Sequence, residues 1–479
     1  MEQTRPKKSI NFGARGWLLI LWVATACLSY VIGGNYPLNI MADVYGGAQT
    51  LSLVYTISCI IGIIIQVIVS RKTGAIKSWK RLSIILGIVT VIFILLIMIL
   101  QPGTLWIICY GLATVLSMLY GTWATYVLVG SWFPTRKGTV MGIITFAFPI
   151  ANALIGVFAT NFFGSYGASM ATADDQIGAL IATGTDPEAA VGIVSNAAAQ
   201  PAAFSAMLPF LIVVVVGLII GAIFISEFPE QVGAYRDNDK NMTPEIAQAM
   251  MKAEEENRKS TVWTTGHTFA SPDFWCITIP MGILLMFAVG AMTQTNAMIS
   301  PYEEIGLIGS IGGYSSMMLF IAGAGIVGSY IFGLIDTKKG TRFAVALSMV
   351  FMLVSGILGA IANGTTLFFA FILLGMFMGA SSNYTISAAV QYWRLEDFPS
   401  VFSVINPVAN LFNCLGPVLV ANLITTSLGT GAIFIAAAIG AVISIILCII
   451  FKPARIKAYD DKYRTAAGKP LDDALVGRK

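Results

Sequence analysis

Long apolar runs alternate with short polar segments along this chain, and the apolar runs are long enough to cross a membrane. A membrane-spanning helix needs about 20 mostly apolar residues. Runs of that kind cover 16–41, 50–70, 81–100, 104–130, 138–163, 204–226, 274–299, 313–335, 342–362, 365–391, 400–425 and 430–451. The pattern therefore predicts an all-α membrane protein with twelve transmembrane helices.

The basic residues give the orientation of these spans. All 28 Lys and Arg residues lie in seven short stretches, and two apolar runs separate each stretch from the next. Basic residues beside a span stay on the cytoplasmic side. Acidic residues without basic neighbours, such as Asp43, Glu303 and Glu304, fall in the alternate segments. We therefore expect both termini in the cytoplasm and these acidic residues on the outer side.

Composition agrees with a membrane protein and argues against several other classes. The chain is 57% hydrophobic and 11% charged, whereas soluble domains carry about 25% charged residues. The net charge of +4 follows from the orientation, so we predict no nucleic-acid partner. The six cysteines lie in apolar runs without a CxxC pair, and His267 is the only histidine. We therefore expect neither a metal site nor a cofactor.

Polar segments divide the chain into four parts. We expect a six-helix half over 1–226, a cytoplasmic linker over 227–272, a second six-helix half over 273–451, and a cytoplasmic tail over 452–479. Within the first half, 164–203 is rich in Ala, Gly and acid, and we expect a solvated outer loop with a little helix, with a substrate-collecting lid as the alternative. In the linker, Thr243 followed by Pro and Glu predicts a helix start, and the linker as a whole is interpreted as a solvated tether.

The two halves repeat each other. The segment 149–152 matches 407–410 at an offset of 258, and Asn39 matches Asn296 at an offset of 257. The segment 333–342 likewise has a counterpart at 67–76. Matches in the same order at similar offsets indicate a duplicated six-span unit, which is one known plan of membrane transporters.

Several of these segments carry a family resemblance. The segment 333–342, with its glycines, acid and arginine, resembles the signature of the major facilitator superfamily. Three others, 132–138, 229–235 and 271–275, resemble the oxalate/formate-antiporter and monocarboxylate-porter group. Bile-acid carriers of gut anaerobes are similar in the same features. The resemblance implies two six-helix halves around a central site lined by spans 1, 4, 7 and 10.

The same resemblance implies a cytoplasmic gate. We expect an acid near a helix end and a nearby arginine to form charge-assisted bonds that hold one conformation. The counterpart in the first half lacks the acid. The candidate gate residues are Gly333, Asp336, Gly340, Arg342 and Arg136.

The deep parts of the spans carry polar side chains but no charge. Family members that carry small dianions place cations in spans 8 and 11, and this chain has none there, which puts a dianion such as oxalate in doubt. Amides and aromatic side chains are the candidates for binding substrate, with hydrogen bonding between helices as the alternative role. They are Asn35, Asn39, Tyr120, Trp123, Tyr126, Asn152, Gln294, Asn296, Asn383, Tyr384, Asn406 and Asn410. Asn413 shares one helix face with the last two.

These features predict a transporter that works by alternating access, not an enzyme. The expected cargo is a small organic anion or monocarboxylate, moved by exchange or facilitated diffusion, or with protons that enter only on a protonated substrate. The alternative cargo is an amphipathic neutral or weakly acidic solute such as a bile acid. A non-transporting membrane sensor is an alternative of another class, but the linker is too short for a signalling domain. We expect a monomer in the cytoplasmic membrane of a bacterium, with a small-molecule substrate and the lipid bilayer as its partners.

Overall fold

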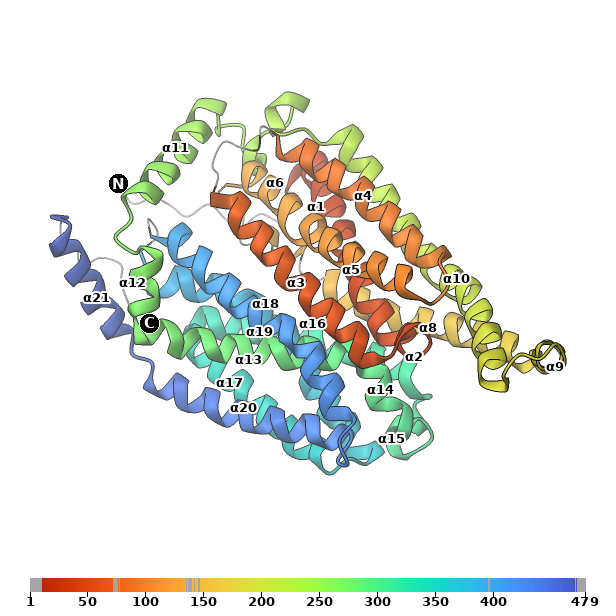
Figure 1. The fold of residues 1–479 in the computed structure, drawn as a ribbon. Coiled ribbons are helices and arrows are strands. Elements are labelled where there is room, and N and C mark those ends of the chain that lie inside the picture. The colour runs from red at the N-terminus through yellow and green to blue at the C-terminus, as the bar shows by residue number, and fades with distance from the viewer. Residues whose placement is uncertain are drawn as a thin grey trace.

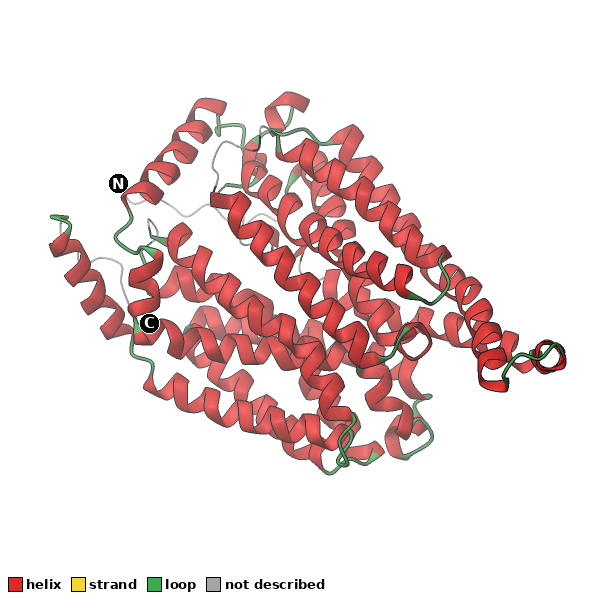
Figure 2. Ribbon diagram, in the orientation of Figure 1, coloured by secondary structure: helices red, strands yellow, loops and turns green. Residues whose placement is uncertain are grey.

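The structure, a computed structural model, is a bundle of helices. It describes residues 11–471, except 72–75, 77, 135, 137–139, 142, 145–146, 395–396 and 470. Every regular element in the described part is a helix (Figures 1 and 2). We call the end of the bundle at which the first span begins and the last span ends the terminal end. The opposite end is called the distal end.

The first half, up to residue 226, alternates long helices with short irregular turns. Its elements are α1 (Gly13–Tyr30), η1 (Val31–Asn35), η2 (Pro37–Met41), α2 (Ala42–Tyr45), α3 (Ala48–Arg71), α4 (Trp79–Ile99), α5 (Thr104–Leu119), η3 (Tyr120–Ala124), α6 (Thr125–Trp132), α8 (Ala147–Ala171), α9 (Asp174–Ala182) and α10 (Pro187–Phe224).

The linker and the second half follow the same plan. The linker holds η4 (Pro229–Val232), η5 (Arg236–Asn238), α11 (Pro244–Ser260) and α12 (Thr265–Ala270). The second half and the tail hold α13 (Pro272–Thr293), α14 (Thr295–Ile299), η6 (Ser300–Tyr302), α15 (Gly306–Ser310), α16 (Gly313–Lys339), α17 (Thr341–Ala360), α18 (Gly364–Tyr392), α19 (Phe398–Ile424), α20 (Thr430–Ile450) and α21 (Pro453–Ala466).

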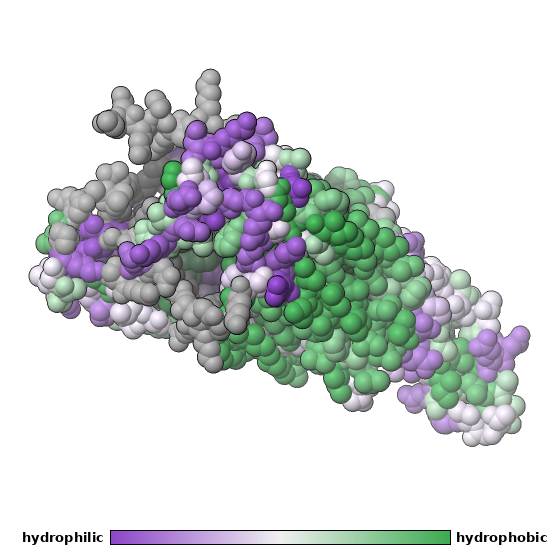
Figure 3. Space-filling view, turned by 90° about the horizontal axis from the view of Figure 1, so that it is seen from above, coloured by the Kyte–Doolittle hydropathy of each residue, from purple (hydrophilic) through white to green (hydrophobic). Residues whose placement is uncertain are grey.

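The long helices agree with the predicted spans wherever the chain is described. Among the described residues, 10 helices are long and apolar enough to cross a membrane, and α18, bent by 46°, makes up to 11. The predicted span 138–163 begins among residues outside the described part, and its residues 147–163 lie in α8. The protein is therefore a multi-pass membrane protein, and the number twelve stays a prediction. A broad apolar surface separates polar regions in Figure 3.

The two halves meet along two helix pairs, α3 with α19 and α8 with α16. Small residues permit the close approach, as is common between membrane helices. A Cβ atom at Gly156 of α8 would clash with Met318 of α16, and the Ser315 hydroxyl donates to the Gly156 carbonyl at 2.8 Å. Within the second half, Gly328 of α16 and Gly375 of α18 lie against backbone of the other helix, so these two helices also pack closely.

The segment 164–203 is nearly all helical, which is much more helix than the sequence led us to expect. Helix α8 runs on to Ala171, α9 follows, and α10 begins at Pro187. Asp186 starts α10 by accepting hydrogen bonds from the N–H groups of Glu188 and Ala189 at 3.0 and 3.3 Å. A proline at the first helical position and many alanines then favour the helix. These helices project beyond the rest of the distal end (Figure 1).

The linker is anchored to both halves, in contrast to the expected solvated tether. Its first part joins the first half, where the backbone N–H of Arg136 donates to Asp237 Oδ1 at 3.1 Å. Its last part joins the second half, where the Ser400 hydroxyl of α19 donates to the Trp263 carbonyl at 2.7 Å. Only α11 lies between the two anchors, and it begins at Thr243 as predicted, with the Thr243 hydroxyl accepting from Ile246 N–H at 3.4 Å. The anchors form because buried charged and aromatic groups of the linker find partners in the halves.

The tail forms a docked helix that the sequence pattern did not predict. Asp460 of α21 is fully buried and accepts hydrogen bonds from Arg394 at 2.8 Å and Arg464 at 3.1 Å. Arg464 also pairs with Asp397 at 3.0 Å. Two arginines and two aspartates thus form a buried network that ties α21 to the connection between α18 and α19.

Candidate functional site

Four spans depart from regular helix at matching places in the two halves. The first span contains the π-helical turns η1 and η2, and its counterpart breaks at Gln294, between α13 and α14. The fourth span contains η3 at Tyr120–Ala124, and its counterpart α18 bends between Met378 and Asn383, at an offset of 258. Such breaks free backbone groups and often mark functional sites. They lie in the spans expected to surround the pathway.

The wide turns of the first half are held by neighbouring side chains. Tyr110 of α5 donates to the Gly34 carbonyl at 3.0 Å, and Thr114 donates to the Gly33 carbonyl at 3.4 Å. In η3, the Gly121 carbonyl accepts from the Cys27 thiol at 3.3 Å. These bonds satisfy carbonyls that the π-helical turns expose, so the irregular backbone is a fixed part of the fold.

A ladder of amides follows one face of α19, as the spacing predicted. Asn410 Nδ2 donates to Asn406 Oδ1 at 3.1 Å, and Asn413 Nδ2 donates to Asn410 Oδ1 at 3.4 Å. Thr385 of α18 also donates to Asn406 Oδ1, at 3.3 Å. The ladder is uncharged and partly buried, and it can both donate and accept hydrogen bonds.

A second polar face lies on α3, the helix of the first half that packs against α19. Tyr55 donates to Asn35 Oδ1 at 3.1 Å and shares a hydrogen bond with the Tyr30 hydroxyl. One and three turns further along the same face lie Cys59 and Gln66, opposite the exposed apolar stripe of α3. The Tyr30 ring also meets Phe148 of α8 edge-on, with centroids 6.5 Å apart. Tyr30, Phe148 and Gln66 were not among the predicted site residues.

Exposure along these faces increases from the distal end to the terminal end. On the inner face of α19, Pro417 and Cys414 are buried, Asn410 and Asn406 are partly exposed, and Ser403 is exposed. On α3, Tyr55 and Cys59 are buried but Gln66 is partly exposed. The side chains on these two faces are therefore more accessible near the terminal end than near the distal end.

Three of the predicted binding residues close the distal end instead of lining an open cavity. Asn39 Nδ2 donates to the Met292 carbonyl at 2.9 Å, and Asn39 Oδ1 accepts from the Asn296 N–H at 2.9 Å. Gln294 donates to Ser52 of α3, also at 2.9 Å, and is 1% exposed. Each of these bonds joins one half to the other, so Asn39, Gln294 and Asn296 form what we call the distal gate.

Other predicted residues bond within their own half. Tyr120 accepts from the Trp22 indole at 2.9 Å and Tyr384 shares a hydrogen bond with Ser348 at 2.7 Å. Both side chains are at most 1% exposed, so they do not line the space between the halves, contrary to the prediction. Buried tyrosine hydroxyls need a partner, and these two find it in a neighbouring helix of the same half.

The remaining predicted residues have varied surroundings. Trp123 packs edge-on against Trp79, with centroids 5.3 Å apart, and Tyr126 shares a hydrogen bond with the Cys27 thiol at 3.2 Å. Asn383 is partly buried at the bend of α18. The side chain of Asn152 lies outside the described residues.

The predicted gate forms a network, but Asp336 and Arg342 bond to different groups. The Asp336 carboxylate accepts from Thr341 at 2.7 Å, from Gln391 at 3.0 Å and from Ser387. The Arg342 guanidinium instead donates to the carbonyls of Cys448 and Ile449 at the end of α20, at 2.7 and 3.2 Å. A cation is favoured at a helix C-terminus, which is the physical reason why Arg342 does not pair with Asp336.

The other gate residues support this end of the bundle. Gly340 has φ of 89° and joins α16 to α17, a conformation that favours glycine. Apart from the neighbouring backbone of α16, no described atom lies within 4 Å of a Cβ placed on Gly333. The Arg136 guanidinium donates to the Asn11 carbonyl at 3.4 Å, within the first half. Residues 72–75 of the first-half counterpart at 67–76 fall outside the described residues.

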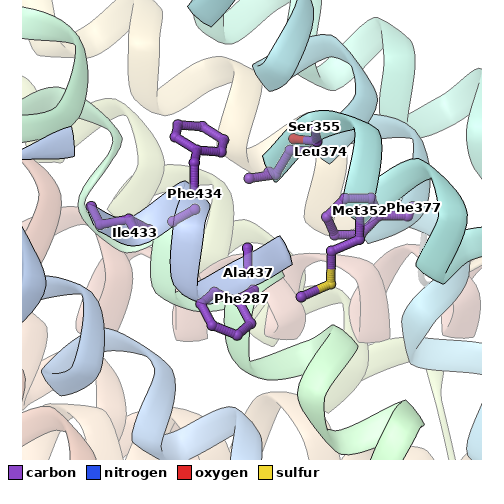
Figure 4. Close-up of a pocket in the computed structure, with 9 residues that line it drawn as sticks. Phe287, Met352, Ser355, Leu374, Phe377, Ile433, Phe434 and Ala437 are labelled. Atoms are coloured by element: carbon purple, nitrogen blue, oxygen red, sulfur yellow. The ribbon is translucent and has the colours of Figure 1, made fainter. Parts of the chain in front are cut away.

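The enclosed void in the second half is not a binding site. It lies between α13, α17, α18 and α20, and aromatic and aliphatic side chains such as Phe287, Phe377 and Phe434 surround it (Figure 4). Its volume is about 10 Å³, which is room for about one water molecule. The hydroxyl of Ser355, its polar residue, already donates to the Ala370 carbonyl at 2.7 Å. No organic solute fits there.

Among the described residues, no group of three or more His, Cys, Asp or Glu side chains is placed to hold a metal ion. The site between α3 and α19 thus offers amides, hydroxyls and aromatic rings to a ligand. Such groups hold a solute by hydrogen bonds and apolar contact.

Comparison with known proteins shows the family. The model of the Major Facilitator Superfamily matches residues 123–417, more than half of the chain. The chain belongs to the Major Facilitator Superfamily. Transporters of this superfamily carry small molecules across membranes, so this member is a transporter. No curated protein matches the sequence significantly.

Solved structures share the superfamily fold at low sequence identity. A bacterial homologue of the human lysosomal transporter Spinster, in an inward-facing conformation, matches with a TM-score of 0.53 and 12% identity, covering 97% of this chain and 100% of that one. A POT family transporter in complex with 5-aminolevulinic acid matches with 0.60 and 13%, covering 96% and 98%. The nucleoside transporter NupG matches with 0.56 and 12%, covering 92% and 99%.

Proposed function

We propose that this superfamily member is a secondary or facilitative transporter of a small organic anion, with a monocarboxylate as the first candidate. The single observation that carries the proposal is the pair of facing polar surfaces on α3 and α19, whose exposure increases towards one end of the bundle. A solute that enters from the terminal end meets Gln66 and Asn406 first and the distal gate last. Rocking of the halves would then release it at the distal end.

We propose that the terminal end faces the cytoplasm. The basic residues at the ends of the spans support this orientation, including Lys338 and Lys339 in the last turn of α16. The distal projection formed by α8, α9 and α10 carries the acidic residues Asp174, Asp175 and Asp186. In this orientation, the greater exposure near the terminal end and the hydrogen bonds of the distal gate support an inward-open form with the outer gate closed.

The second candidate cargo is an amphipathic neutral or weakly acidic solute. The uncharged character of the ladder Asn406, Asn410 and Asn413 favours it, because these amides offer hydrogen bonds but no charge. The superfamily fold does not choose between the two candidates, since one fold serves many substrates.

Counterflow in proteoliposomes tests the proposal. Vesicles preloaded with one unlabelled solute from a panel of carboxylates and bile acids should accumulate the same labelled solute, with and without a proton gradient. Asn406→Ala and Asn410→Ala should each raise the KM by about 2- to 12-fold, because that is the loss of affinity expected when one hydrogen bond to the bound solute is removed. Asn161→Ala, an exposed amide on α8, is the matched control. Absence of counterflow for every solute of the panel would refute both candidates.

A further inference from the structure

Two amides on the facing surfaces of α3 and α19 lack a hydrogen-bond partner. The Nε2 atom of Gln66 and the Oδ1 atom of Asn413 are both buried, and neither has a partner among the described residues. Buried polar atoms without a partner are rare in native proteins, and each calls for an explanation such as an absent ligand. One of these atoms is a donor and the other an acceptor.

Both amides belong to the surfaces between the halves. Gln66 is on the side of α3 opposite its exposed apolar residues Ile57, Ile61, Ile64 and Ile68, and it shares that side with Cys59. Asn413 continues the amide ladder of α19 and uses its Nδ2 atom to bond Asn410. Both unpartnered atoms therefore belong to the faces of α3 and α19 that carry the polar side chains of the candidate site.

The antiparallel register of α3 and α19 sets the spacing between the two amides. Gln49 of α3 lies within hydrogen-bonding distance of Asn422 at 3.5 Å, and Thr56 donates to the Cys414 carbonyl at 2.7 Å. This register places Asn413 level with the turn of α3 that contains Cys59. Gln66 lies two turns further towards the terminal end, which is on the order of 10 Å along the helix axis.

Between the two levels, α19 presents Asn406 and Asn410, whose amides bond to each other at 3.1 Å, and the first half presents mostly apolar groups. The first half contributes the Tyr30 and Phe148 rings, whose centroids are 6.5 Å apart, and the Cys59 thiol. A short solute of two or three carbons can contact either Gln66 Nε2 or Asn413 Oδ1, but it leaves the other atom without a hydrogen-bond partner. An elongated solute with an apolar body satisfies both.

We propose that Gln66 and Asn413 bind the two ends of one elongated organic solute. This inference rests on the transporter function proposed above and refines its cargo. The end at Gln66 carries an oxygen acceptor such as a carboxylate, the end at Asn413 carries a hydroxyl or amide donor, and an apolar body of about 10 Å joins them. The cargo class is thus a long hydroxylated monocarboxylate, which lies between the two candidate classes.

Binding of defined probes to the purified full-length protein tests the spacing. The probes are 10-hydroxydecanoate, decanoate, which lacks the distant hydroxyl, and 4-hydroxybutyrate, which is too short. All are used below their micelle-forming concentrations, and binding is measured by calorimetry. The unmodified protein should bind 10-hydroxydecanoate more tightly than either of the other two, by about 2- to 12-fold for each missing hydrogen bond. Equal affinity for decanoate and 10-hydroxydecanoate overturns the inference.

Variants assign each end of the solute. Gln66→Met keeps the side-chain length and should weaken both 10-hydroxydecanoate and decanoate. Asn413→Leu should weaken 10-hydroxydecanoate only, because decanoate has no hydroxyl to lose. Gln101→Met, an exposed glutamine near the distal end, is the control. If Asn413→Leu folds poorly, Asn413→Ser, which keeps a hydroxyl acceptor, takes its place. The comparison of the three probes on the unmodified protein then decides whether the inference holds.

The outcome separates this inference from the transporter function. If vesicles show counterflow of short carboxylates and Gln66→Met and Asn413→Leu leave it unchanged, the inference is wrong and the transporter function stands. If the probes bind with the predicted ranking but no solute of the panel is transported, the site is right and the transporter function is wrong.

Discussion

Asn39 accepts a hydrogen bond at 2.9 Å from the backbone N–H of Asn296, its counterpart in the sequence repeat. Two equivalent residues that touch must lie close to the axis that relates the halves. The contact therefore places this axis in the distal gate. Asn39 is 5% exposed, and its amide also donates to the Met292 carbonyl at 2.9 Å, so one side chain bridges the halves twice.

Asn39→Ala should open the distal gate. It removes two hydrogen bonds between the halves, which together stabilise the closed state by about 1–3 kcal/mol. Asn296→Ala is a matched control, because Asn296 takes part through its backbone N–H and keeps that bond. Spin labels at Gln101 and Leu428, exposed distal positions in different halves, measure the opening. Longer distances in Asn39→Ala alone are expected, and the same change in both variants would contradict the mechanism.

The tail helix α21 gives a second prediction. Asp460 accepts hydrogen bonds from Arg394, Arg464 and Trp263, and it is fully buried. Asp460→Ala leaves the arginines buried without their partner, which costs about 3–5 kcal/mol. Thermal unfolding in detergent should show lower stability, and hydrogen exchange should show α21 undocked. Asp461→Ala removes the neighbouring, more exposed carboxylate and should change neither. Equal effects of the two substitutions would rule out a specific role for the network.

The hydrophobic pattern was sufficient to predict where the spans lie in the sequence, but it did not predict which side of each helix faces the pathway. Lipid-facing and core-facing sides of a membrane helix are both apolar, because lipid is as apolar as the core. Tyr120 and Tyr384 were thus expected to face the pathway, whereas they face neighbouring helices of their own half. Gln66 was missed because a single amide in an apolar run does not show which side of the helix faces the other half. Its position opposite Ile57, Ile61 and Ile64 was the available signal.

The amide ladder and the gate show what spacing can and cannot predict. Residues at i, i+4 and i+7 must share a helix face, so the contacts among Asn406, Asn410 and Asn413 follow from local geometry. The partners of Asp336 and Arg342 depend on α18 and α20, which are distant in the sequence. A motif match identified the residues of this gate, but only the packed structure shows which groups bond.

Asp336→Asn should slow transport with little change in KM. The carboxylate accepts hydrogen bonds from Thr341, Gln391 and Ser387, and an amide turns one acceptor into a donor. Hydrogen bonds to a charged group contribute about 1.5–3 kcal/mol, so the terminal end of α16 should loosen against α18. Exchange rates in vesicles measure the effect, with the exposed Asp175→Asn as control. If the exchange rate of Asp336→Asn is unchanged, the segment 333–342 serves only to orient the chain in the membrane and is not a gate.

The orientation of the chain gives a prediction that is independent of the substrate. A cysteine introduced at Thr183, in the distal projection, should react with a membrane-impermeant maleimide on intact cells. A cysteine at Gln248 of α11 should react only after the membrane is opened. Both positions are exposed in the structure, so access to the reagent depends on the side of the membrane. The reverse pattern would mean that the terminal end faces outward.

Coupling to protons is the last prediction, and it follows from where the acidic residues lie. A proton-coupled transporter needs a group that changes protonation within reach of both sides of the membrane. The acids nearest the distal gate, Asp43, Glu303 and Glu304, are exposed and therefore solvated. Changing Asp43 to Asn and both glutamates to Gln should leave substrate-driven exchange intact, as measured by counterflow with a pH-sensitive dye inside the vesicles. Because Asn39 lies in the same gate but carries no charge, Asn39→Ala serves as the control that disturbs the gate without removing a titratable group. A substrate-dependent proton flux that the triple change abolishes and Asn39→Ala preserves would instead place the coupling site at the distal end.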